Sequence, residues 1–144
     1  MAVGNVSLEQ VREVAPLNSA CVACGHENPG GLHLEFHVGR KCASARWTTR
    51  AGWESFRGII HGGVISTVMD EAMSKAIISE GYQALTAELK IRFRAKVSVD
   101  EELRVQGWVV SVQKRKIVAE ATLTTADGME KAHAWSAFLV VRNP

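Results

Sequence analysis

Residues that could act together in one reaction occur close to one another in the middle of the sequence. The tripeptide His61-Gly62-Gly63 opens the run VISTVMDEA, and the carboxylate of Asp70 follows nine residues after the histidine. The hydroxyl of Thr86 comes 16 residues after Asp70. A carboxylate can serve as a base or a nucleophile, whereas backbone N–H groups at the start of a helix can stabilise an oxyanion. We therefore expect chemistry in this part of the chain first.

Two acids stand side by side in this run, and helical spacing gives them different partners. Glu71 has Lys75 four residues later, in the favourable order for an ion pair on a helix surface. Asp70 has Ser66 and Ser74 at the corresponding spacings and no basic neighbour on its own helix. A carboxylate in a half-dry place without a charge partner is expected to have a raised pKa and to be a candidate base or nucleophile. A structural role in hydrogen bonds to a neighbouring element is the alternative.

The two glycines are costly inside a helix, by about 1 kcal/mol each relative to alanine. They fall where a helix exposes unpaired N–H groups, and without side chains they let a ligand oxygen come close. The positive end of the helix dipole lies at the same place. This position favours a functional role for Gly62 and Gly63 at the helix entrance.

The sequence around this run predicts one buried helix, because an apolar arc recurs there at helical spacing. The arc consists of Val64, Ile65, Val68, Met69, Ala72, Met73, Ala76 and Ile77. Before it, alternation of period two predicts strands at 32–38 and 42–49, joined by a hairpin across residues 39–41. After it, unbroken alternation over 85–99 predicts a long strand, with Leu85, Leu89 and Phe93 on the dry face and Thr86 on the wet face.

Further strands are expected at 102–113, 116–125 and 129–141, so the fold class is α+β, with about five to six antiparallel strands wrapped around one central helix. The whole chain, 1–144, is expected to form a single domain. Within it, residues 1–30 should supply a short N-terminal helix, which ends before Pro16, and a cysteine-containing lead-in loop rich in Gly, Pro and Asn.

Composition narrows the class of protein. The chain has 144 residues, 47% of them hydrophobic and 22% charged, which excludes a disordered protein and a membrane span. A net charge of +2 argues against a nucleic-acid binder that works by phosphate neutralisation. The first twenty residues contain no apolar stretch of signal-peptide length, and the cysteine count is odd. We therefore expect a cytoplasmic protein with free thiols.

The segment GIIHGGVISTVMDEA resembles the signature of hotdog-fold acyl-CoA thioesterases of the phenylacetate-pathway (PaaI-like) family. The upstream CVACGHENPGGLHLEF is similar to the Cys-rich, Asn-Pro-x-Gly-Leu lead-in of many members. The likeness covers roughly residues 17–142. It implies a sheet wrapped around a central helix, dimers formed by edge-strand pairing, and active sites at the dimer interface.

The resemblance also implies roles for particular residues. The Gly62 amide would polarise the thioester carbonyl, and Asp70 would act as general base on water or as nucleophile. Thr86 matches a hydroxyl position that helps to hold the water or the acid, and His61 would orient the loop and contact the thioester, or else simply satisfy the helix entrance. Many relatives carry an asparagine six residues before the histidine, where this chain has Ser55, so the way in which water is held departs from the family pattern.

Three cysteines and a histidine invite a zinc interpretation, since Cys21-x-x-Cys24-x-His26 is followed later by Cys42. Structural zinc takes four ligands, usually as two close pairs, and only one pair is evident. We therefore expect no metal, and a lead-in loop that packs as a lid near the acyl pocket with its cysteines as small apolar residues.

Two groups of cations are candidates for the phosphates of coenzyme A. One is the row Lys90, Arg92, Arg94 and Lys96, and the other is the turn Lys114, Arg115 and Lys116. Such a row is usually just a solvated strand face. We expect the turn together with Arg92, and Gly63 at the helix entrance, to contact coenzyme A, because a phosphate site needs only two or three donors.

The sequence thus predicts an acyl-CoA thioesterase that works as a homodimer or homotetramer without a cofactor, since coenzyme A is part of the substrate. One alternative is a hotdog enoyl-CoA hydratase, which would need a different arrangement of Asp and His. The other is a noncatalytic acyl-CoA-binding protein, against which Asp70, Gly62 and Thr86 argue. The acyl group is not readable from the sequence.

Overall fold

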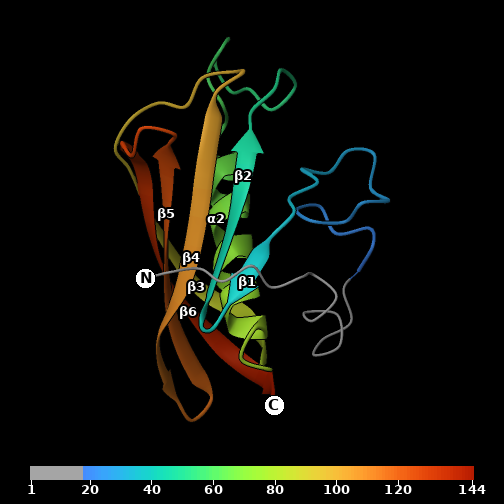
Figure 1. Cartoon of the computed structure of the whole chain (residues 1–144), viewed down its shortest axis with the longest axis vertical. Coiled ribbons are helices and arrows are strands. Elements are labelled where there is room, and N and C mark those ends of the chain that lie inside the picture. Colours follow the sequence, from blue (N-terminus) through green and yellow to red (C-terminus); the bar gives the residue numbers. More distant parts are fainter. Residues whose placement is uncertain (1–17) are drawn as a thin grey trace.

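A computed structural model describes residues 18–144. Over this range one long helix lies against one face of a six-stranded antiparallel sheet (Figure 1). The elements are β1 (His37–Gly39), β2 (Cys42–Thr48), α2 (Gly62–Ile78), β3 (Gln83–Phe93), β4 (Glu102–Gln113), β5 (Lys116–Thr125) and β6 (Glu130–Arg142). The predicted hotdog architecture, a sheet wrapped around a central helix, is confirmed.

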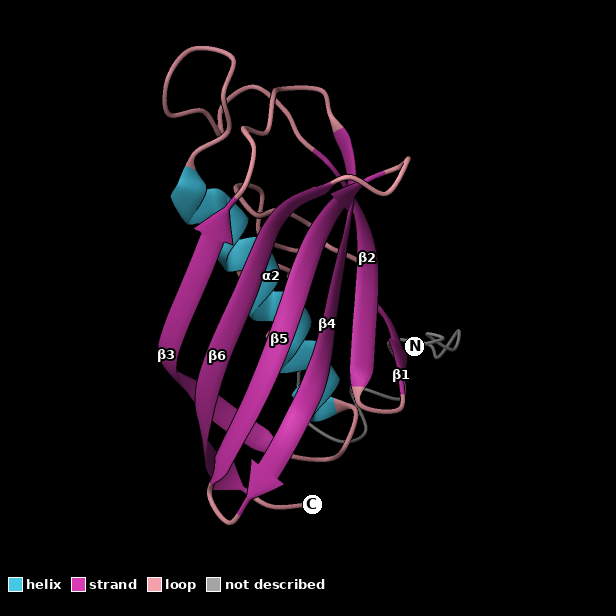
Figure 2. Ribbon diagram, turned by 90° about the vertical axis from the view of Figure 1, so that its left-hand side faces the viewer, coloured by secondary structure: helices cyan, strands magenta, loops and turns pink. Residues whose placement is uncertain are grey.

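The strands lie in the order β1-β2-β4-β5-β6-β3, so β1 and β3 form the two edges of the sheet. Figure 2 shows the sheet in front of the helix, with β3 at the left-hand edge and β1 at the right. The two edges differ in length, since β1 has 3 residues and β3 has 11. An exposed edge presents unpaired backbone N–H and C=O groups, and β3 presents far more of them than β1.

The helix buries the apolar arc predicted for it, with Val64 only half-buried at its start. It crosses β4 so closely that a Cβ atom at Gly107 would lie 2.5 Å from the backbone carbonyl of Ala72. Only glycine permits this approach. Met69, Met73 and Phe138 are among the largest side chains that become fully buried where helix and sheet meet.

The first predicted strand, 32–38, is wrong in its extent, because β-pairing begins only at His37. Burial does alternate as predicted, with Leu34, Phe36 and Val38 inside. The upstream backbone is engaged elsewhere, since the N–H groups of Leu32 and Leu34 donate to the carbonyls of the lead-in loop at 22 and 23. These donors are therefore satisfied without a strand partner.

The long strand predicted over 85–99 ends at Phe93, and its alternation is broken by a β-bulge. Thr86 pairs with Phe138 and Glu88 with Ala137, so Ala87 is an extra residue in β3. A one-residue slip turns every later side chain to the other face of a sheet. Thr86 therefore faces the helix, on the same side as Leu89 and the strand's last residue, and the predicted wet face is wrong for it.

Residues 18–36 contain turns and irregular backbone without a helix or strand, which agrees with the loop predicted up to residue 30 but not with the strand predicted from residue 32. The short helix predicted before residue 18 lies outside the described residues. Among residues 18–144, no helix has the length and apolar character needed to cross a membrane.

Candidate active site

The helix entrance is organised by His61, which occupies the N-cap position of α2. Its ring Nδ1 accepts a hydrogen bond from the N–H of Gly63, at 2.8 Å. A Cβ atom at Gly63 would lie 3.0 Å from that nitrogen and push the ring away. His61 therefore caps the helix, and Gly63 is a glycine because the cap needs the space. The predicted use of the Gly63 N–H for a ligand is wrong in this arrangement, since the cap already takes it.

The backbone N–H of Gly62 is available to a ligand, unlike that of Gly63, which donates to His61. Within residues 18–144 no backbone carbonyl accepts from the Gly62 N–H, and the first residue of a helix has no intrahelical acceptor. A Cβ atom here would lie 3.4 Å from the ring of Phe93, at the end of β3. Gly62 thus combines a free N–H with room for a close neighbour, as an oxyanion donor requires.

Asp70 lies further along α2 and is oriented by β3. The hydroxyl of Thr86 donates to Asp70 Oδ1 at 2.7 Å, which is possible because the bulge turns Thr86 toward the helix. Burial raises the pKa of Asp70 above its ordinary value of 3.8, the Thr86 hydrogen bond lowers it in part, and the neighbouring Glu71 raises it. The direction agrees with the prediction, and it suits a carboxylate that accepts a proton.

One chain does not bring Asp70 and Gly62 into a single site. They are eight residues apart on α2, which is about 12 Å along the helix axis. A reacting carbonyl must lie about 3 Å from both its oxyanion donor and its attacking group. The two functions predicted for one site therefore stand two helical turns apart in each chain.

Ser55 lies on the loop before α2, and its side chain is exposed. Its backbone N–H donates to the carbonyl of Ile59, at 2.9 Å, which closes a turn of this loop. Among the described residues its hydroxyl has no partner that would connect it to Asp70. A water-holding role for Ser55 stays a prediction.

The predicted coenzyme A site is split in the structure. The turn 114–116 lies beside the start of β3, because Lys116 is opposite Leu139 and Leu139 is opposite Leu85. Arg92 comes seven residues later on β3, about 23 Å away at 3.3 Å per residue. One chain cannot use Arg92 and this turn for the same phosphate group, so the predicted combination would need two subunits and stays a prediction.

A different pair of cations lies next to Gly62. Arg94 and Lys96 follow β3 and line an apolar pocket of about 390 Å³ at the helix entrance. Its other lining residues are Ile59, Ile60, Gly62, Ile65, Phe93, Ala95 and Val97. Arg94 also forms an ion pair with Glu130, at 2.7 Å. The prediction included both cations in the basic row but did not choose them, because the end of β3 could not be placed beside Gly62 from sequence.

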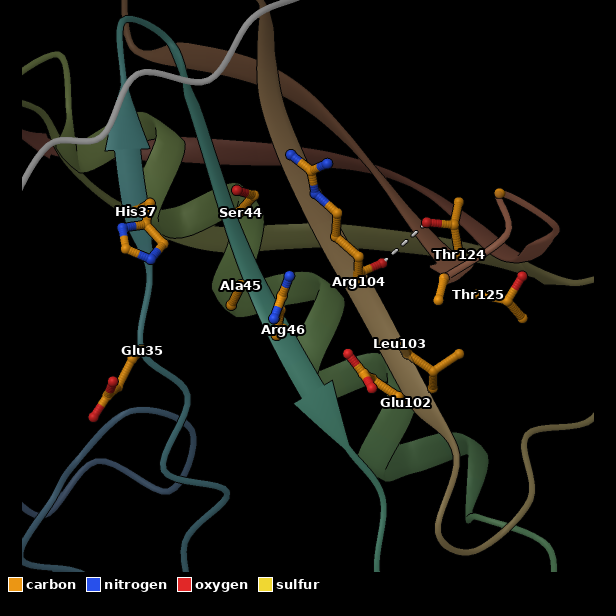
Figure 3. A pocket seen from close by; sticks show the side chains of 12 residues that line it. Glu35, His37, Ser44, Ala45, Arg46, Glu102, Leu103, Arg104, Thr124 and Thr125 are labelled. Carbon is orange, nitrogen blue, oxygen red and sulfur yellow. Dashed lines mark hydrogen bonds between the residues drawn. The ribbon is translucent and has the colours of Figure 1, made fainter.

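A larger groove of about 660 Å³ lies elsewhere, over β2, β4 and the end of β5 (Figure 3). Charged and polar side chains line much of it, among them Glu35, His37, Arg46 and Arg104. It includes neither Asp70 nor Gly62. Its size therefore does not make it the reaction site.

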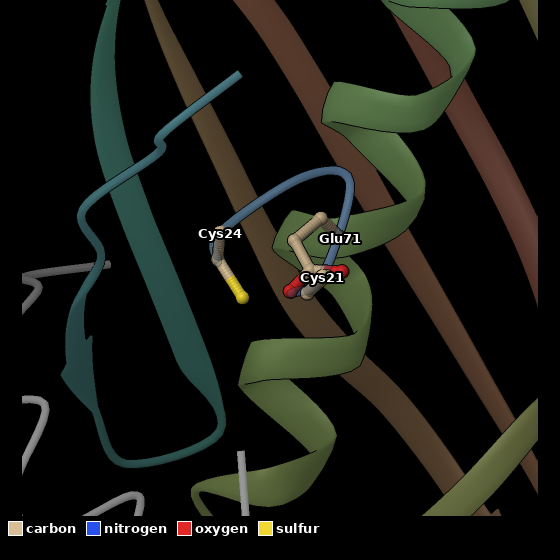
Figure 4. Close-up of side chains that lie close together, drawn as sticks. All are labelled: Cys21, Cys24 and Glu71. Carbon is tan, nitrogen blue, oxygen red and sulfur yellow. The ribbon is translucent and has the colours of Figure 1, made fainter. Parts of the chain in front are cut away.

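Glu71 and Lys75 form the predicted ion pair, but it is buried and does not lie at the surface. Their atoms are 3.4 Å apart, but the Lys75 side chain is only 1% exposed and that of Glu71 17%. The thiols of Cys21 and Cys24 lie over this pair, with Glu71 between the loop and the helix (Figure 4). Burial and the nearby Glu71 raise the pKa of Cys24 to about 12. The side of α2 next to Asp70 is thus covered by the lead-in loop.

Comparison with known proteins places these features in a family. A model of the thioesterase superfamily matches residues 57–132, more than half of the chain. The mouse acyl-coenzyme A thioesterase THEM4 is 30% identical over 70 residues, which cover 49% of this chain and 30% of that protein. The chain therefore matches less than a third of the length of this curated relative.

Solved structures show the same fold. A thioesterase superfamily protein is 25% identical, with a TM-score of 0.75 over 80% of this chain and 60% of that one. The PaaI protein of the E. coli phenylacetic acid degradation operon is 18% identical, with a TM-score of 0.72 over 75% and 83%. A Streptococcus pneumoniae thioesterase variant is 19% identical, with a TM-score of 0.72 over 76% and 91%.

The family match spans both parts of the site, since residues 57–132 include the capped helix entrance and the Asp70–Thr86 pair. The sheet that encloses the helix agrees with the solved relatives in its fold. The chain therefore belongs to the thioesterase superfamily and has the hotdog fold of its solved relatives, the PaaI protein among them.

Proposed function

We propose that this protein is an acyl-CoA thioesterase in which Asp70 is the general base. The observation that carries the proposal is the hydrogen bond from Thr86 to Asp70, which fixes one oxygen of a half-buried carboxylate and leaves the other oxygen for water. The raised pKa of Asp70 makes it a better proton acceptor than an exposed aspartate. The name of the mouse relative supports the substrate class.

In the proposed reaction Asp70 takes a proton from water while the water oxygen attacks the thioester carbonyl carbon. The carbonyl oxygen becomes an oxyanion, which the N–H of Gly62 stabilises; one such donor is worth on the order of 10²–10³ in rate. The carbon–sulfur bond then breaks, and the coenzyme A thiolate receives the proton from Asp70. The products are a free acid and coenzyme A, and no redox cofactor takes part.

Direct attack by Asp70 on the carbonyl is the alternative course of the same reaction. It would form an anhydride between Asp70 and the acyl group, which water then cleaves. Label found in the protein after a single turnover in ¹⁸O-labelled water would establish the anhydride course, because only cleavage of an anhydride at the aspartyl carbonyl leaves the label in Asp70.

Assembly of the site requires a second copy of the chain in this proposal. Gly62 and Asp70 stand about 12 Å apart along α2, too far to act on one carbonyl. The edge of β3 that faces away from β6 is open, and Leu85, Leu89 and Phe93 on it are 65%, 39% and 49% exposed. Pairing of two β3 strands would cover this edge and let the Gly62 of one copy serve the Asp70 of the other.

The larger assembly and the cellular setting are also part of the proposal. A homotetramer made from two such dimers is expected, and the three free thiols suit a reducing compartment such as the cytoplasm.

Coenzyme A capture is assigned in the proposal to Arg94 and Lys96, because they line the pocket that contains Gly62. Two structures of Streptococcus pneumoniae thioesterase variants support the role of the acid and the hydroxyl. An aspartate and a threonine 16 positions apart were each replaced by alanine in that protein, and the same spacing separates Asp70 and Thr86 here. The same protein has also been crystallised with coenzyme A.

The decisive experiment measures release of free thiol from short, medium, long and aromatic acyl-CoAs by the wild type and by Asp70→Asn. We expect turnover of at least one class, and a loss of about 10²–10⁴-fold in kcat/KM in the variant with its fold intact. Asp127→Asn, which removes an exposed carboxylate in the β5–β6 turn, is the matched control and should keep wild-type kcat/KM. Wild-type turnover by Asp70→Asn would contradict the proposal, and coenzyme A binding without any turnover would favour a noncatalytic binding protein.

A further inference from the structure

Three side chains that can bind a metal meet where the lead-in loop packs over α2. Cys21 and Cys24 come from that loop, and Glu71 comes from the part of α2 beneath it (Figure 4). One ligand atom from each, two sulfurs and a carboxylate oxygen, lies within 4.8 Å of the others. All three residues are partly buried, so water can still reach the cluster.

The spacing of these atoms is close to that of a tetrahedral zinc site. Zinc–sulfur bonds of about 2.3 Å separate two ligand sulfurs by about 3.8 Å in a tetrahedron. The observed limit of 4.8 Å requires a closure of at most about 1 Å, which side-chain rotation can supply. Two thiolates and a carboxylate are ligands that zinc accepts, whereas magnesium and calcium prefer oxygen alone.

The loop holds its two cysteines in place through its own backbone. The N–H of Gly25 donates to the carbonyl of Cys21, at 2.9 Å, and a Cβ atom at Gly25 would lie 2.3 Å from the Cys21 nitrogen. The carbonyls of Val22 and Ala23, between the cysteines, accept from the segment at 32 and 34. Both thiols are therefore presented by an ordered turn, which lowers the entropy lost when a metal binds.

Charge balance permits a cation here although Lys75 lies 3.4 Å from Glu71. A divalent ion, two thiolates, one carboxylate and one ammonium group sum to zero charge. A half-buried cluster is least costly when it is neutral. The Lys75 ammonium lies 3.4 Å from Oε1 of Glu71, and a carboxylate has a second oxygen that can bind a metal.

We propose that Cys21, Cys24 and Glu71 bind one zinc ion, with water as the fourth ligand. The expectation of no metal depended on finding a single pair of ligands, and Glu71 adds a third from a distant part of the chain. The ion would tie the lead-in loop to α2 at the residue next to Asp70.

The test is the metal content of the full chain purified without chelators from zinc-supplemented medium. We expect about one zinc per chain by mass spectrometry of the elements, and a sulfur-to-cobalt charge-transfer band with tetrahedral d–d bands after exchange with cobalt. Cys21→Ser and Cys24→Ser should each lose most of the zinc and the band. Cys42→Ala, which removes the third thiol from buried β2, should keep both.

Glu71→Gln is a weaker test because it also breaks a buried ion pair, so the cysteine variants carry the conclusion. A chelator should lower the Tm of the wild type and leave that of Cys21→Ser unchanged. A wild type without zinc and without a cobalt–thiolate band would overturn the proposal, as would zinc that persists in both serine variants. An intact mass lower by two hydrogen atoms under non-reducing conditions would show that Cys21 and Cys24 form a disulfide and not a metal site. These readouts do not depend on thioester hydrolysis.

Discussion

Asp70 and Glu71 are neighbours in the chain and carry the same functional group, yet they occupy opposite environments. Asp70 receives a hydrogen bond from Thr86 of β3 and has no ion-pair partner among the described residues. Glu71 lies against the buried Lys75 and two thiols of the lead-in loop. One residue step on a helix turns a side chain by about 100°, and this rotation separates an acid available for chemistry from an acid tied into structure.

The largest expected effect is on protein stability, and it should distinguish Glu71 from Asp70. Replacing Glu71 by Gln leaves the ammonium of Lys75 buried without its carboxylate. We expect a loss of about 3 kcal/mol in the free energy of unfolding, measured by urea denaturation. Glu102→Gln, an exposed glutamate on β4, is the control and should change stability by less than about 0.5 kcal/mol. Equal stability of Glu71→Gln and this control would show that the Glu71 environment is no different from the surface.

The next effect probes the Asp70 side through its hydrogen bond. Thr86→Val removes the donor that lowers the pKa of Asp70, so this pKa should rise further and the acid limb of the kcat/KM profile should move to higher pH. Loss of a hydrogen bond to a charged group should lower kcat/KM by about 10-fold or more. Thr86→Ser keeps the hydroxyl and should retain most of the activity. An unchanged pH profile in Thr86→Val would mean that Thr86 does not orient the base.

A smaller effect links Asp70 to pH-dependent stability. Because the fold raises its pKa, the protonated form is favoured in the native state, and the stability it contributes is present below the ordinary value of 3.8 and lost as pH rises through the raised pKa. Asp70→Asn should therefore raise Tm at neutral pH, and the gain should shrink in acid. A lower Tm at neutral pH, measured by scanning calorimetry, would contradict the desolvation of Asp70.

The smallest effect extends the comparison to the helix entrance, where neither acid contributes. Gly63→Ala should push the His61 ring off its cap position, which costs about 1 kcal/mol, while alanine recovers a similar amount of helix propensity. The net change in unfolding free energy should stay within about 1 kcal/mol. In a His61→Ala background the same substitution should be stabilising. If it is stabilising by the same amount in both backgrounds, the cap contributes nothing.

Much of the site could be predicted from sequence because helical spacing is local. The apolar arc, the position of the two glycines and the lack of a basic neighbour for Asp70 are all properties of about 20 consecutive residues, and the structure confirms α2 and the raised pKa of Asp70. The strands follow the alternation of apolar residues equally well where their pairing is regular, as over residues 102–109 of β4 and 116–123 of β5.

The predictions from sequence are wrong where an irregularity of the backbone or a contact between distant segments determines the structure. The bulge at Ala87 reverses the face of Thr86, and alternation alone gives no sign of it. The family resemblance points to Thr86 as a site residue, whereas strict alternation places its side chain on the face away from the helix. The thiols near Glu71 belong to a loop about 50 residues upstream, and a pair at helical spacing had already explained that glutamate. Neither feature is written in a local pattern.

The single extra residue at Ala87 also sets a limit on how this protein can be redesigned. A designer who deleted Ala87 would obtain regular pairing to β6 from Ala84 to Phe93. Every β3 side chain on one side of the deletion would then turn to the opposite face of the sheet. As a result, either the hydroxyl of Thr86 or the apolar row ending at Phe93 would no longer face the helix. Regularity of the strand and completeness of the site are therefore mutually exclusive in this sequence.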